Sequence, residues 1–471
     1  MAGGESERDD PAVRLLERDS CLASVGGWAA EAQAGDGRLV LVAGEAGVGK
    51  SALVERLRAG RTADRWTVSA CDGLFTPRPL GPLFDIADQV GGGLRDQCNA
   101  GAGRAELFRA LLHQLGLRGV LDVLVVEDVH WADEATLDLL RYLGRRLHRV
   151  RALLIATYRD DSLAADDPLR IVLGDLVRQR ATRQVTLEPL SVAAVRELAA
   201  GSGLDPAALH RLTGGNPFYV TEVLQAGTAA VPVSARDATL ARAAGLPGEL
   251  RATLDAAALI GNRVEPGLLA AVTGCSPAGI DRLLATGLLV DDGSDLRFRH
   301  EIARLVVQDA VAAHRGTGVH RRILAALRDV GCDDDSRMAF HAEAAGDAAA
   351  ALRHARSAAR RAVGLASHRE AAAQFQRALR FAGGVGTIER AELYEGLAAE
   401  LSLLERYEAA ADAAERALSS NRSARAPSWP GRTRPPPISG CCTTSPARSI
   451  WHDGPRTSAT ASVPATSSAT R

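Results

Sequence analysis

The stretch Gly44-Glu45-Ala46-Gly47-Val48-Gly49-Lys50-Ser51 fits the phosphate-binding pattern G-x-x-x-x-G-K-[ST]. Lys50 is the only lysine in a chain of 471 residues that has 56 basic side chains. An ammonium on a flexible stem can reach the β- and γ-phosphates of a nucleotide, whereas the planar guanidinium of arginine is a poor substitute in so narrow a loop. The sequence therefore predicts that this loop binds a nucleoside triphosphate, ATP or its product ADP, together with Mg²⁺.

The residues on both sides of the loop predict the strand and the helix that the motif requires. Residues 38–43 are apolar and largely β-branched, as in a buried parallel strand, and residues 51–57 have helical spacing. A bound phosphate would therefore lie at a helix N-terminus and accept backbone N–H groups of the glycine-rich turn. Ser51 would offer its hydroxyl to Mg²⁺. A glycine-rich turn that binds nothing is the alternative, and the order strand, loop, helix argues against it.

Two acids follow a second apolar strand. The run 123–126 is typical of a buried strand, and Glu127 and Asp128 come directly after it. Ligands of parallel α/β sheets bind at the carboxyl ends of the strands, where two carboxylates can hold hydrated Mg²⁺ and orient an attacking water. Neighbouring strand residues point to opposite faces, so the sequence leaves open which acid faces Mg²⁺ and which faces water.

A third apolar strand, at 153–158, ends on Arg159. A guanidinium at this edge could sense the γ-phosphate, and an ion pair with a neighbour such as Asp160 is the alternative. Between the second and third strands, a helix is predicted over 134–148. Its leucines recur with helical spacing along one face, at Leu137, Leu140, Leu143 and Leu147.

Together these motifs resemble the signal-transduction ATPases with numerous domains, which have an AAA-type ATPase module. The resemblance is to the large LuxR-type transcriptional regulators, whose ATPase module is similar to that of the maltose regulator. Besides the loop around Lys50, it rests on Val-Val-Glu-Asp-Val-His-Trp-Ala-Asp at 125–133, Ala-Thr-Tyr-Arg-Asp-Asp at 156–161 and Thr-Gly-Gly-Asn-Pro-Phe-Tyr-Val at 213–220. It covers about residues 12–420 of this chain.

The resemblance implies three further nucleotide contacts. In that family the proline of a Gly-Asn-Pro turn packs on the adenine from a helical lid, which assigns Pro217. An arginine near the N-terminus also helps to bind the nucleotide, which assigns Arg18, although the usual Gly-Arg reads Glu17-Arg18 here. His300 corresponds to the histidine that contacts the β-phosphate in the resting, ADP-bound state; a purely structural role is the alternative for a lone histidine.

The expected architecture is multidomain, α/β followed by α. A parallel P-loop sheet is joined by a helical lid, a winged helix and tetratricopeptide-like repeats. In the resembling family the winged helix is a regulatory clamp, and here its surface mixes acids with arginines, without a basic stripe. The predicted segments are a P-loop ATPase domain at 12–187, a helical lid and linker at 188–246, a winged-helix-like domain at 247–319, repeats at 320–420 and a tail at 421–471.

The repeats are indicated by self-similarity. The order Glu-Ala-Ala-Ala to Arg-Ala-Leu at 370–379 recurs at 408–418, so Leu379 and Leu418 lie 39 residues apart. Small residues let the two helices of a hairpin approach closely, and such arrays bind partners or inducers on a concave surface. A genome-wide alanine bias is the alternative, but it predicts alanine anywhere and does not predict this order.

The tail differs from everything before it. Residues 421–471 contain no leucine, one acid and eight of the twenty prolines, a composition that cannot bury a core and predicts disorder. The abrupt change resembles a gene that is truncated or read out of frame.

Composition and charge exclude other classes. A net charge of −1 offers no electrostatic argument for a nucleic-acid or membrane surface. No run of about eighteen apolar residues appears, and the N-terminus is acidic and polar, so a cytoplasmic protein is expected. Seven cysteines lack a C-x-x-C pattern, which argues against zinc and against a disulfide framework and predicts free thiols.

These patterns favour an ATP-binding regulatory switch that hydrolyses ATP slowly with Mg²⁺. An inducer or protein partner would bind the repeats, and an ATP-dependent homo-oligomer is possible. The alternatives are a P-loop kinase acting on a small molecule and a scaffold that holds nucleotide without turnover.

We expect no sequence-specific DNA binding from this chain at physiological salt. In the resembling regulators the repeats continue and end in a helix-turn-helix, whereas residues 421–471 lack the apolar spacing of such a unit. Seven arginines against one aspartate there could attract phosphates only weakly and in a salt-dependent manner. A gel shift that compares promoter fragments with scrambled DNA tests this. A salt-resistant preference for one fragment would show that residues 247–319 read DNA.

Overall fold

The computed structural model describes residues 15–425 except for 74–76, 118, 162, 165–166, 227–239, 241, 292 and 294. The last described helix, α21 (Tyr407–Arg425), corrects the predicted start of the tail, because residues 421–425 are helical. No glycine or proline follows Tyr407 until Pro427, so nothing in the sequence ends the helix at 420. The rest of the predicted tail, 426–471, lies outside the described residues.

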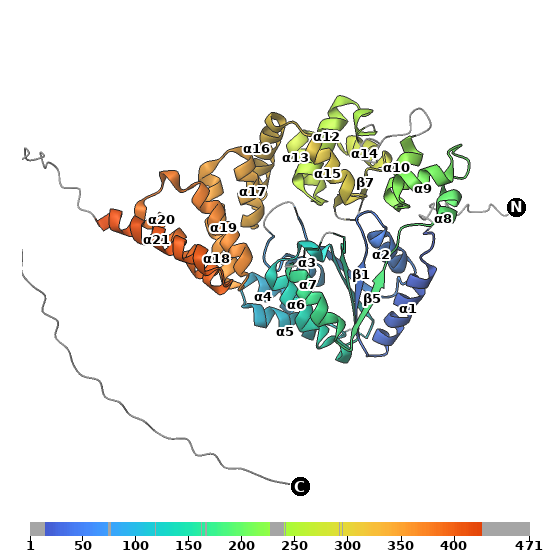
Figure 1. The fold of residues 1–471 in the computed structure, drawn as a ribbon, viewed down its shortest axis with the longest axis horizontal. Helices are drawn as coiled ribbons and strands as arrows, with labels where there is room; N and C mark the ends of the chain where they lie inside the picture. Colours follow the sequence, from blue (N-terminus) through green and yellow to red (C-terminus); the bar gives the residue numbers. More distant parts are fainter. Residues whose placement is uncertain are drawn as a thin grey trace, which may run out of the picture. The chain divides into compact units, whose positions relative to one another are not determined.

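A five-stranded parallel sheet forms the centre of the first part of the chain, in the order β2-β3-β4-β1-β5 (Figure 1). The expected parallel P-loop sheet is thereby confirmed. In the pairing register, Val40 and Val125 lie opposite Ile155 from its two sides. The strands are β1 (Arg38–Ala43), β2 (Arg65–Ala70), β3 (Asp122–Glu127), β4 (Ala152–Tyr158) and β5 (Thr182–Thr186).

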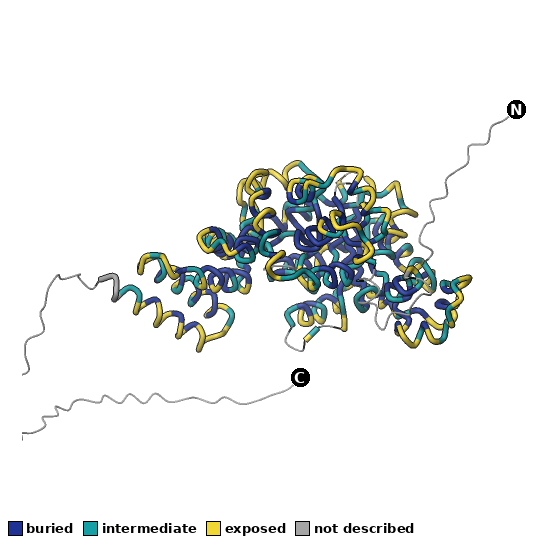
Figure 2. Tube along the Cα trace, turned by 90° about the horizontal axis from the view of Figure 1, so that it is seen from above, coloured by how far each residue is buried: buried dark blue, intermediate teal, exposed yellow. Residues whose placement is uncertain are grey.

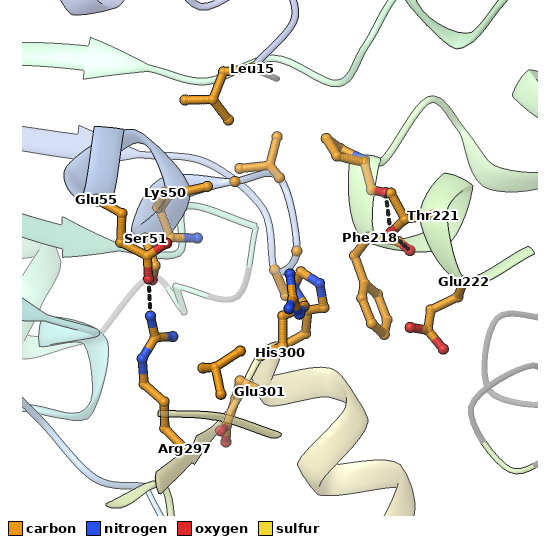
Figure 3. Close-up of a pocket in the computed structure, with 18 of the residues that line it drawn as sticks. Leu15, Lys50, Ser51, Glu55, Phe218, Thr221, Glu222, Arg297, His300 and Glu301 are labelled. Carbon is orange, nitrogen blue, oxygen red and sulfur yellow. Dashed lines mark hydrogen bonds and ion pairs between the residues drawn. The ribbon is translucent and has the colours of Figure 1, made fainter. Parts of the chain in front are cut away.

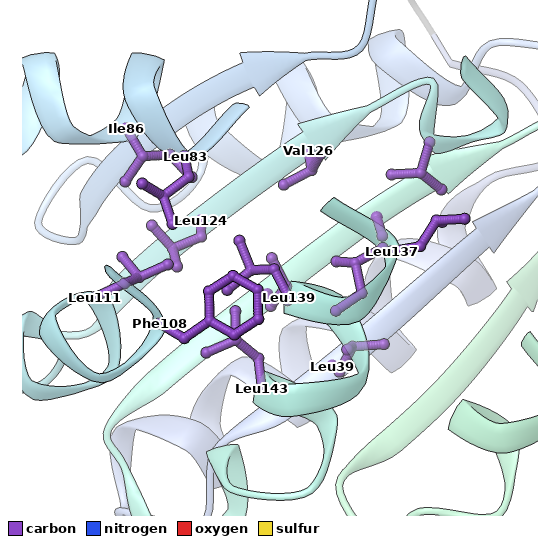
Figure 4. Packing of buried hydrophobic residues seen from close by; sticks show 14 of the residues in the cluster. Leu39, Leu83, Ile86, Phe108, Leu111, Leu124, Val126, Leu137, Leu139 and Leu143 are labelled. Carbon is purple, nitrogen blue, oxygen red and sulfur yellow. The ribbon is translucent and has the colours of Figure 1, made fainter. Parts of the chain in front are cut away.

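Alternating strand residues build a separate core on each face of the sheet. Leu124 and Val126 pack with Phe108, Leu111 and the other residues of the larger cluster (Figure 4). Val123 and Val125 face the smaller cluster, formed with α1 and α2. The helices that contribute to the smaller cluster are α1 (Asp19–Gln33) and α2 (Lys50–Ala59); those of the larger are α3 (Gly81–Val90), α4 (Gly92–Asn99), α5 (Arg104–Gln114), α6 (Glu134–Gly144) and α7 (Pro168–Val177).

Helix α6 is shorter than predicted. It ends at Gly144, and a 3-10 turn at Leu147–Arg149 replaces its expected last turn. The chain must reverse there to enter β4 at Ala152, and Leu147 still reaches the same core from the separate turn. The apolar spacing was therefore right about which leucines are buried and wrong about the length of the helix.

The lid and the winged-helix segment follow the sheet. In the winged-helix segment, β7 and β8 pair as an antiparallel hairpin, and a third short strand, β6, pairs with β8 in the order β6-β8-β7. Two residues are too few to show strand periodicity, so β6 had no signal in the sequence. The lid consists of α8 (Val192–Leu198), α9 (Pro206–Thr213) and α10 (Pro217–Ala226); the next segment consists of α12 (Gly248–Ile260), β6 (Arg263–Val264), α13 (Pro266–Thr273), α14 (Pro277–Ala285), β7 (Leu289–Asp291), β8 (Leu296–Phe298) and α15 (Glu301–Ala310).

Six consecutive helices complete the described chain, and each packs on the next. The recurring sequence falls on α19 and α21, the second helices of two successive pairs. Both helices contribute to a hydrophobic cluster rich in buried alanine that also includes residues of α17, α18 and α20, and in Figure 2 buried and exposed positions alternate along the last helices. The helices are α16 (Ala313–Asp329), α17 (Asp335–Ala345), α18 (Ala348–Gly364), α19 (His368–Arg380), α20 (Thr387–Leu403) and α21.

No individual helix within the described ranges combines the length and the apolar character of a membrane span. The pair α13 and α14, bent by 110°, meets that test by length and composition only. Leu269 of α13 and Leu283 of α14 are buried in the protein core.

Candidate nucleotide-binding site

The loop Gly44–Ser51 connects β1 to α2 and holds Lys50 in a buried position. Lys50 Nζ donates to the carbonyl oxygens of Gly44 and Glu45, at 2.7 Å and 2.9 Å. Gly47 has φ +83°, and a Cβ there would lie 2.8 Å from the Cβ of Phe218. Burial lowers the pKa of Lys50, and the charge of Asp128 opposes that shift. The loop thus presents a desolvated ammonium, whose attraction to phosphate is stronger than in water.

The lid is bonded directly to this loop through the turn before α10. Asn216 Nδ2 donates to Glu45 Oε1 at 2.7 Å and to the carbonyl oxygen of Ala46 at 2.8 Å, and the Phe218 N–H donates to the Gly47 carbonyl oxygen at 3.3 Å. Gly215, with φ +76°, lets this turn approach, since a Cβ there would lie 2.2 Å from the Leu190 carbonyl oxygen. Sequence reasoning singled out only Pro217 in this turn. The Gly-Gly-Asn run was the available signal for a close backbone approach.

The two acids after β3 have different surroundings. Glu127 continues the strand on the face of α2, and its carboxylate accepts a hydrogen bond from the Ser51 hydroxyl. Burial raises the pKa of Glu127 to about 7, with a further contribution from Asp128. The backbone of Asp128, directly after the strand, has a left-handed conformation with φ +55°. Its side chain lines the cavity described below. Burial also raises the pKa of Asp128, against the charges of Arg159 and Lys50.

Arg159 and His130 complete this end of the sheet. Arg159 follows β4, lines the cavity and lies near enough for its charge to act on Asp128. His130 Nδ1 lies 3.8 Å from Asp128 Oδ1, and neither ring nitrogen has a hydrogen-bond partner within the described structure. Burial, together with the charges of Arg159 and Lys50, lowers the pKa of His130 to about 3. Its imidazole is therefore neutral at physiological pH.

Arg18 lies against the loop from the N-terminal side. Its Nη2 donates to the carbonyl oxygens of Val48 and Glu188, at 3.3 Å and 2.6 Å. Glu17 has φ +59°, a conformation that favours glycine, the residue expected at this position from the resemblance. The Glu17 carboxylate accepts hydrogen bonds from the backbone N–H and the hydroxyl of Ser191, which hold the residue in this strained conformation.

These elements enclose a cavity of about 700 Å³ (Figure 3). The winged-helix segment contributes His300, whose ring centroid lies 4.5 Å from that of Phe218, and Arg297, which pairs with Glu55 of α2. Burial and three nearby arginines lower the pKa of His300 to about 3, so it can act only as a neutral donor or acceptor. Predicted site residues on the lining are Arg18, Ala46, Gly47, Val48, Gly49, Lys50, Ser51, Asp128, Arg159, Pro217 and His300.

Three predicted residues do not line the cavity and are bonded to residues that do. Gly44 and Glu45 accept hydrogen bonds from Lys50, and Glu127 accepts one from Ser51. Sequence reasoning missed Asn216, Phe218 and Arg297, because it took only Pro217 from the lid turn and only His300 from the winged-helix segment as nucleotide contacts.

Residues 14–156 match the family model of the AAA ATPase domain. The chain carries an AAA ATPase domain. An uncharacterized protein of Rhizobium meliloti (strain 1021) is 27% identical over 412 residues, which cover 70% of this chain and 39% of that relative. The chain thus spans well under half of the relative's length.

Solved structures agree with the fold. A signal transduction ATPase with numerous domains from Pyrococcus horikoshii, which has a tetratricopeptide repeat sensor, superposes with a TM-score of 0.54 at 16% identity, covering 87% of this chain and 65% of that one. This likeness concerns the fold, including the C-terminal helical repeats. Cdc6p from Pyrobaculum aerophilum covers 67% of this chain and 96% of its own at 15% identity, with a TM-score of 0.37, too low to support an argument.

The residues that line or support this cavity fit a nucleoside triphosphate with Mg²⁺. The loop supplies a buried ammonium and glycines with positive φ, which aim backbone N–H groups in one direction. Ser51 and two carboxylates whose pKa values are raised offer oxygen ligands of the kind that Mg²⁺ takes. A cation bound there would favour the ionised form of both carboxylates and so offset the cost of burying them.

We predict that Lys50→Ala weakens ATP binding by roughly 10–100-fold, the value of a charge-assisted hydrogen bond to the phosphates. Titration of a fluorescent ATP analogue measures the change, and circular dichroism checks that the variant is folded. Arg56→Ala is the matched control, since Arg56 is an exposed cation on the same helix. Wild-type affinity in Lys50→Ala would show that the loop does not hold the phosphates.

We predict that Glu127→Gln stabilises the nucleotide-free protein by about 1–3 kcal/mol at pH 8, because the glutamine removes a buried charge. The pKa of Glu127 rises from 4.5 to about 7 on folding, so its contribution to stability is full below pH 4.5 and is lost as the pH rises through 7. The gain from glutamine should accordingly vanish near pH 4. Urea unfolding at several pH values tests this, with exposed Glu415→Gln as control. A pH-independent difference would contradict it.

Proposed function

We propose that this chain is an ATP-binding regulatory switch with slow, Mg²⁺-dependent ATP hydrolysis, corresponding to the sensor and ATPase part of a LuxR-type transcriptional regulator. The observation that carries the proposal is the composition of the cavity wall. The loop residue Lys50, the lid residue Phe218 and the winged-helix residue His300 line one cavity. A nucleotide bound there would touch three segments of the chain at once, so its identity can influence how they are arranged.

Each group in the site has a role in this proposal. Lys50 and the backbone of the loop bind the β- and γ-phosphates, and Pro217 with Phe218 packs on the base side. Mg²⁺ supplies neutralisation of phosphate charge when it binds with ATP. Ser51 and Glu127, which are hydrogen-bonded to each other, would hold the Mg²⁺ ion. Asp128, which lines the cavity, would orient the attacking water. Arg159 binds the γ-phosphate, and Arg18 fixes the loop through the Val48 carbonyl.

The same contacts explain why turnover would be slow. His300 is neutral and its ring packs against that of Phe218 at an interplanar angle of 56°, and the ion pair between Arg297 and Glu55 joins the winged-helix segment to α2. These contacts hold the lid and the winged helix over the phosphate loop. Exchange of ADP then requires that they separate, and separation, more than chemistry, would limit the rate. A partner on the repeats that binds the separated form more tightly would shift this equilibrium, and ATP-dependent self-assembly would follow from the separated form.

We predict that Glu127→Gln with Asp128→Asn retains ATP binding and stops hydrolysis. The two amides preserve shape but cannot hold the cation or orient water, so turnover should fall at least about 100-fold. Phosphate release under single-turnover conditions measures it. The matched control is Asp412→Asn with Glu415→Gln, two exposed acids on α21.

The same assay separates the alternatives. ADP formation that accelerates with one member of a metabolite panel would favour a kinase. Bound ADP without turnover in the wild type would favour a scaffold. Normal turnover in the double variant would show that the acids are wrongly assigned.

A further inference from the structure

Two helix starts from distant parts of the chain meet head to head. Helix α6 begins at Glu134, directly after the acid segment of the ATPase domain, and α19 begins at His368 in the repeats. Glu134 Oε2 accepts the backbone N–H groups of His368 and Arg369, at 3.0 Å and 3.4 Å. In return, the carboxyl of Glu370 accepts a hydrogen bond from the backbone N–H of Glu134. Each helix thus receives from the other a carboxyl for its unpaired first-turn N–H groups.

A buried serine joins the two carboxyls at the centre of this contact. Ser367 Oγ lies 3.2 Å from Asp133 Oδ2 and 2.7 Å from Glu370 Oε2. Ser367 is fully buried and Asp133 is 1% exposed. Just before this serine, Leu365 of the repeats packs into the larger hydrophobic core of the ATPase domain. The contact is therefore dry, and its hydrogen bonds have no water to replace them if they break.

Asp133 also holds the segment that carries the acids of the site. Its carboxylate accepts the backbone N–H groups of Leu80 and Thr136, both at 3.1 Å. Between Asp128 and Asp133 the chain forms one tight turn, in which the Trp131 N–H donates to the Asp128 carbonyl oxygen at 2.9 Å. Asp128 has φ +55°, a strained conformation that persists only where the surroundings impose it. A shift of Asp133 is therefore passed to Asp128 through a short, hydrogen-bonded turn.

We propose that Asp133 is a positioning residue for the acid turn and that the repeats control the nucleotide site by docking Ser367, His368 and Glu370 of the α19 start onto it. The proposal rests on the proposed function. With the contact made, the turn at Asp128 is held in place and the repeats keep the ATPase domain in its resting arrangement. When a partner draws the repeats away, α6 loses the Glu370 cap, Asp133 loses the serine, and the acid turn is released.

Proton counting adds a condition for this contact. A serine hydroxyl has one hydrogen, so Ser367 can donate to only one of the two carboxyls, and the other must itself be protonated to donate to the serine. Burial, with the nearby Asp133 charge, raises the pKa of Glu370 to about 7, and burial raises that of Asp133. The contact is complete while the pair holds one proton and weakens as the pH rises through 7. The other charged groups around it are Glu134 on α6, His368 and Arg369 on α19, Glu400 of α20 bonded to His368, and Arg361 of α18 over the Phe84 ring.

The test uses the full chain with three variants. Ser367→Ala removes the bridging hydroxyl. Glu370→Gln keeps the shape and supplies an amide N–H that donates to the serine at every pH, so it imitates the protonated acid. Ser357→Ala is the matched control, because Ser357 is bonded to Asp335 within the repeats. Hydrogen–deuterium exchange of the peptide 127–137 reports the acid turn, and dissociation of a fluorescent ADP analogue at pH 6 and pH 8 reports the site.

We expect Ser367→Ala to speed both exchange at 127–137 and ADP release by roughly tenfold, as for a typical coupling between sites. Wild type should release ADP faster at pH 8 than at pH 6, whereas Glu370→Gln should release it slowly at both. This difference isolates Glu370, because the substitution leaves His368 and the other groups at the contact unchanged. Ser357→Ala should behave as wild type.

Two results would overturn the proposal. One is wild-type exchange at 127–137 in Ser367→Ala, and the other is faster exchange with unchanged ADP release, which would make the contact purely structural. A wild-type protein that binds no nucleotide analogue would overturn the proposed function itself. A wild-type protein that binds the analogue while Ser367→Ala matches it overturns only the control by the repeats.

Discussion

The rest of the site depends on how the buried ammonium of Lys50 is held. It is held by two carbonyl oxygens of its own loop, and its charge acts on Asp128 and His130. A cation can be buried in this way only where acceptors and carboxylates surround it. The parallel sheet meets this requirement because the carboxyl ends of β1, β3 and β4 lie at one edge and deliver the loop, the two acids and Arg159 together.

Strain and burial are concentrated at the same edge. Asp128 and Glu17 have left-handed backbone conformations, and both lie within the machinery that surrounds the loop. Glu127, Asp128 and His130 all have pKa values displaced toward their neutral forms by burial. A nucleotide phosphate with its cation would rebalance these charges. Burial of these charged groups therefore lowers the stability of the nucleotide-free protein, a cost that is common at functional sites.

Polar contacts between segments join the parts of the molecule around the cavity. Asn216 ties the lid to the loop, Arg297 ties the winged-helix segment to α2, and Ser367 ties the repeats to α6. Hydrogen bonds and ion pairs of this kind have well-defined made and broken states. In the proposed switch, these are the contacts that would break when the segments separate.

Much of the fold and part of the site could be predicted from contiguous residues. The loop 44–51, the strands that end at Glu127 and Tyr158, and the helices of the repeats each have a local pattern with the period of their element. The length of α6 and the strand β6 could not be predicted, since a chain reversal and a two-residue pairing leave no periodic signal.

By itself, then, the sequence determined which residue types stand at the carboxyl edge of the sheet, because a strand and the loop after it are continuous in the chain. Only the tertiary structure decided that Glu127, and not Asp128, is bonded to Ser51, because the backbone conformation of Asp128 turns that side chain away from the strand's alternation. Only the tertiary structure brought Ser367 to Asp133, 234 residues earlier, because that contact depends on how the repeats pack and on no local pattern.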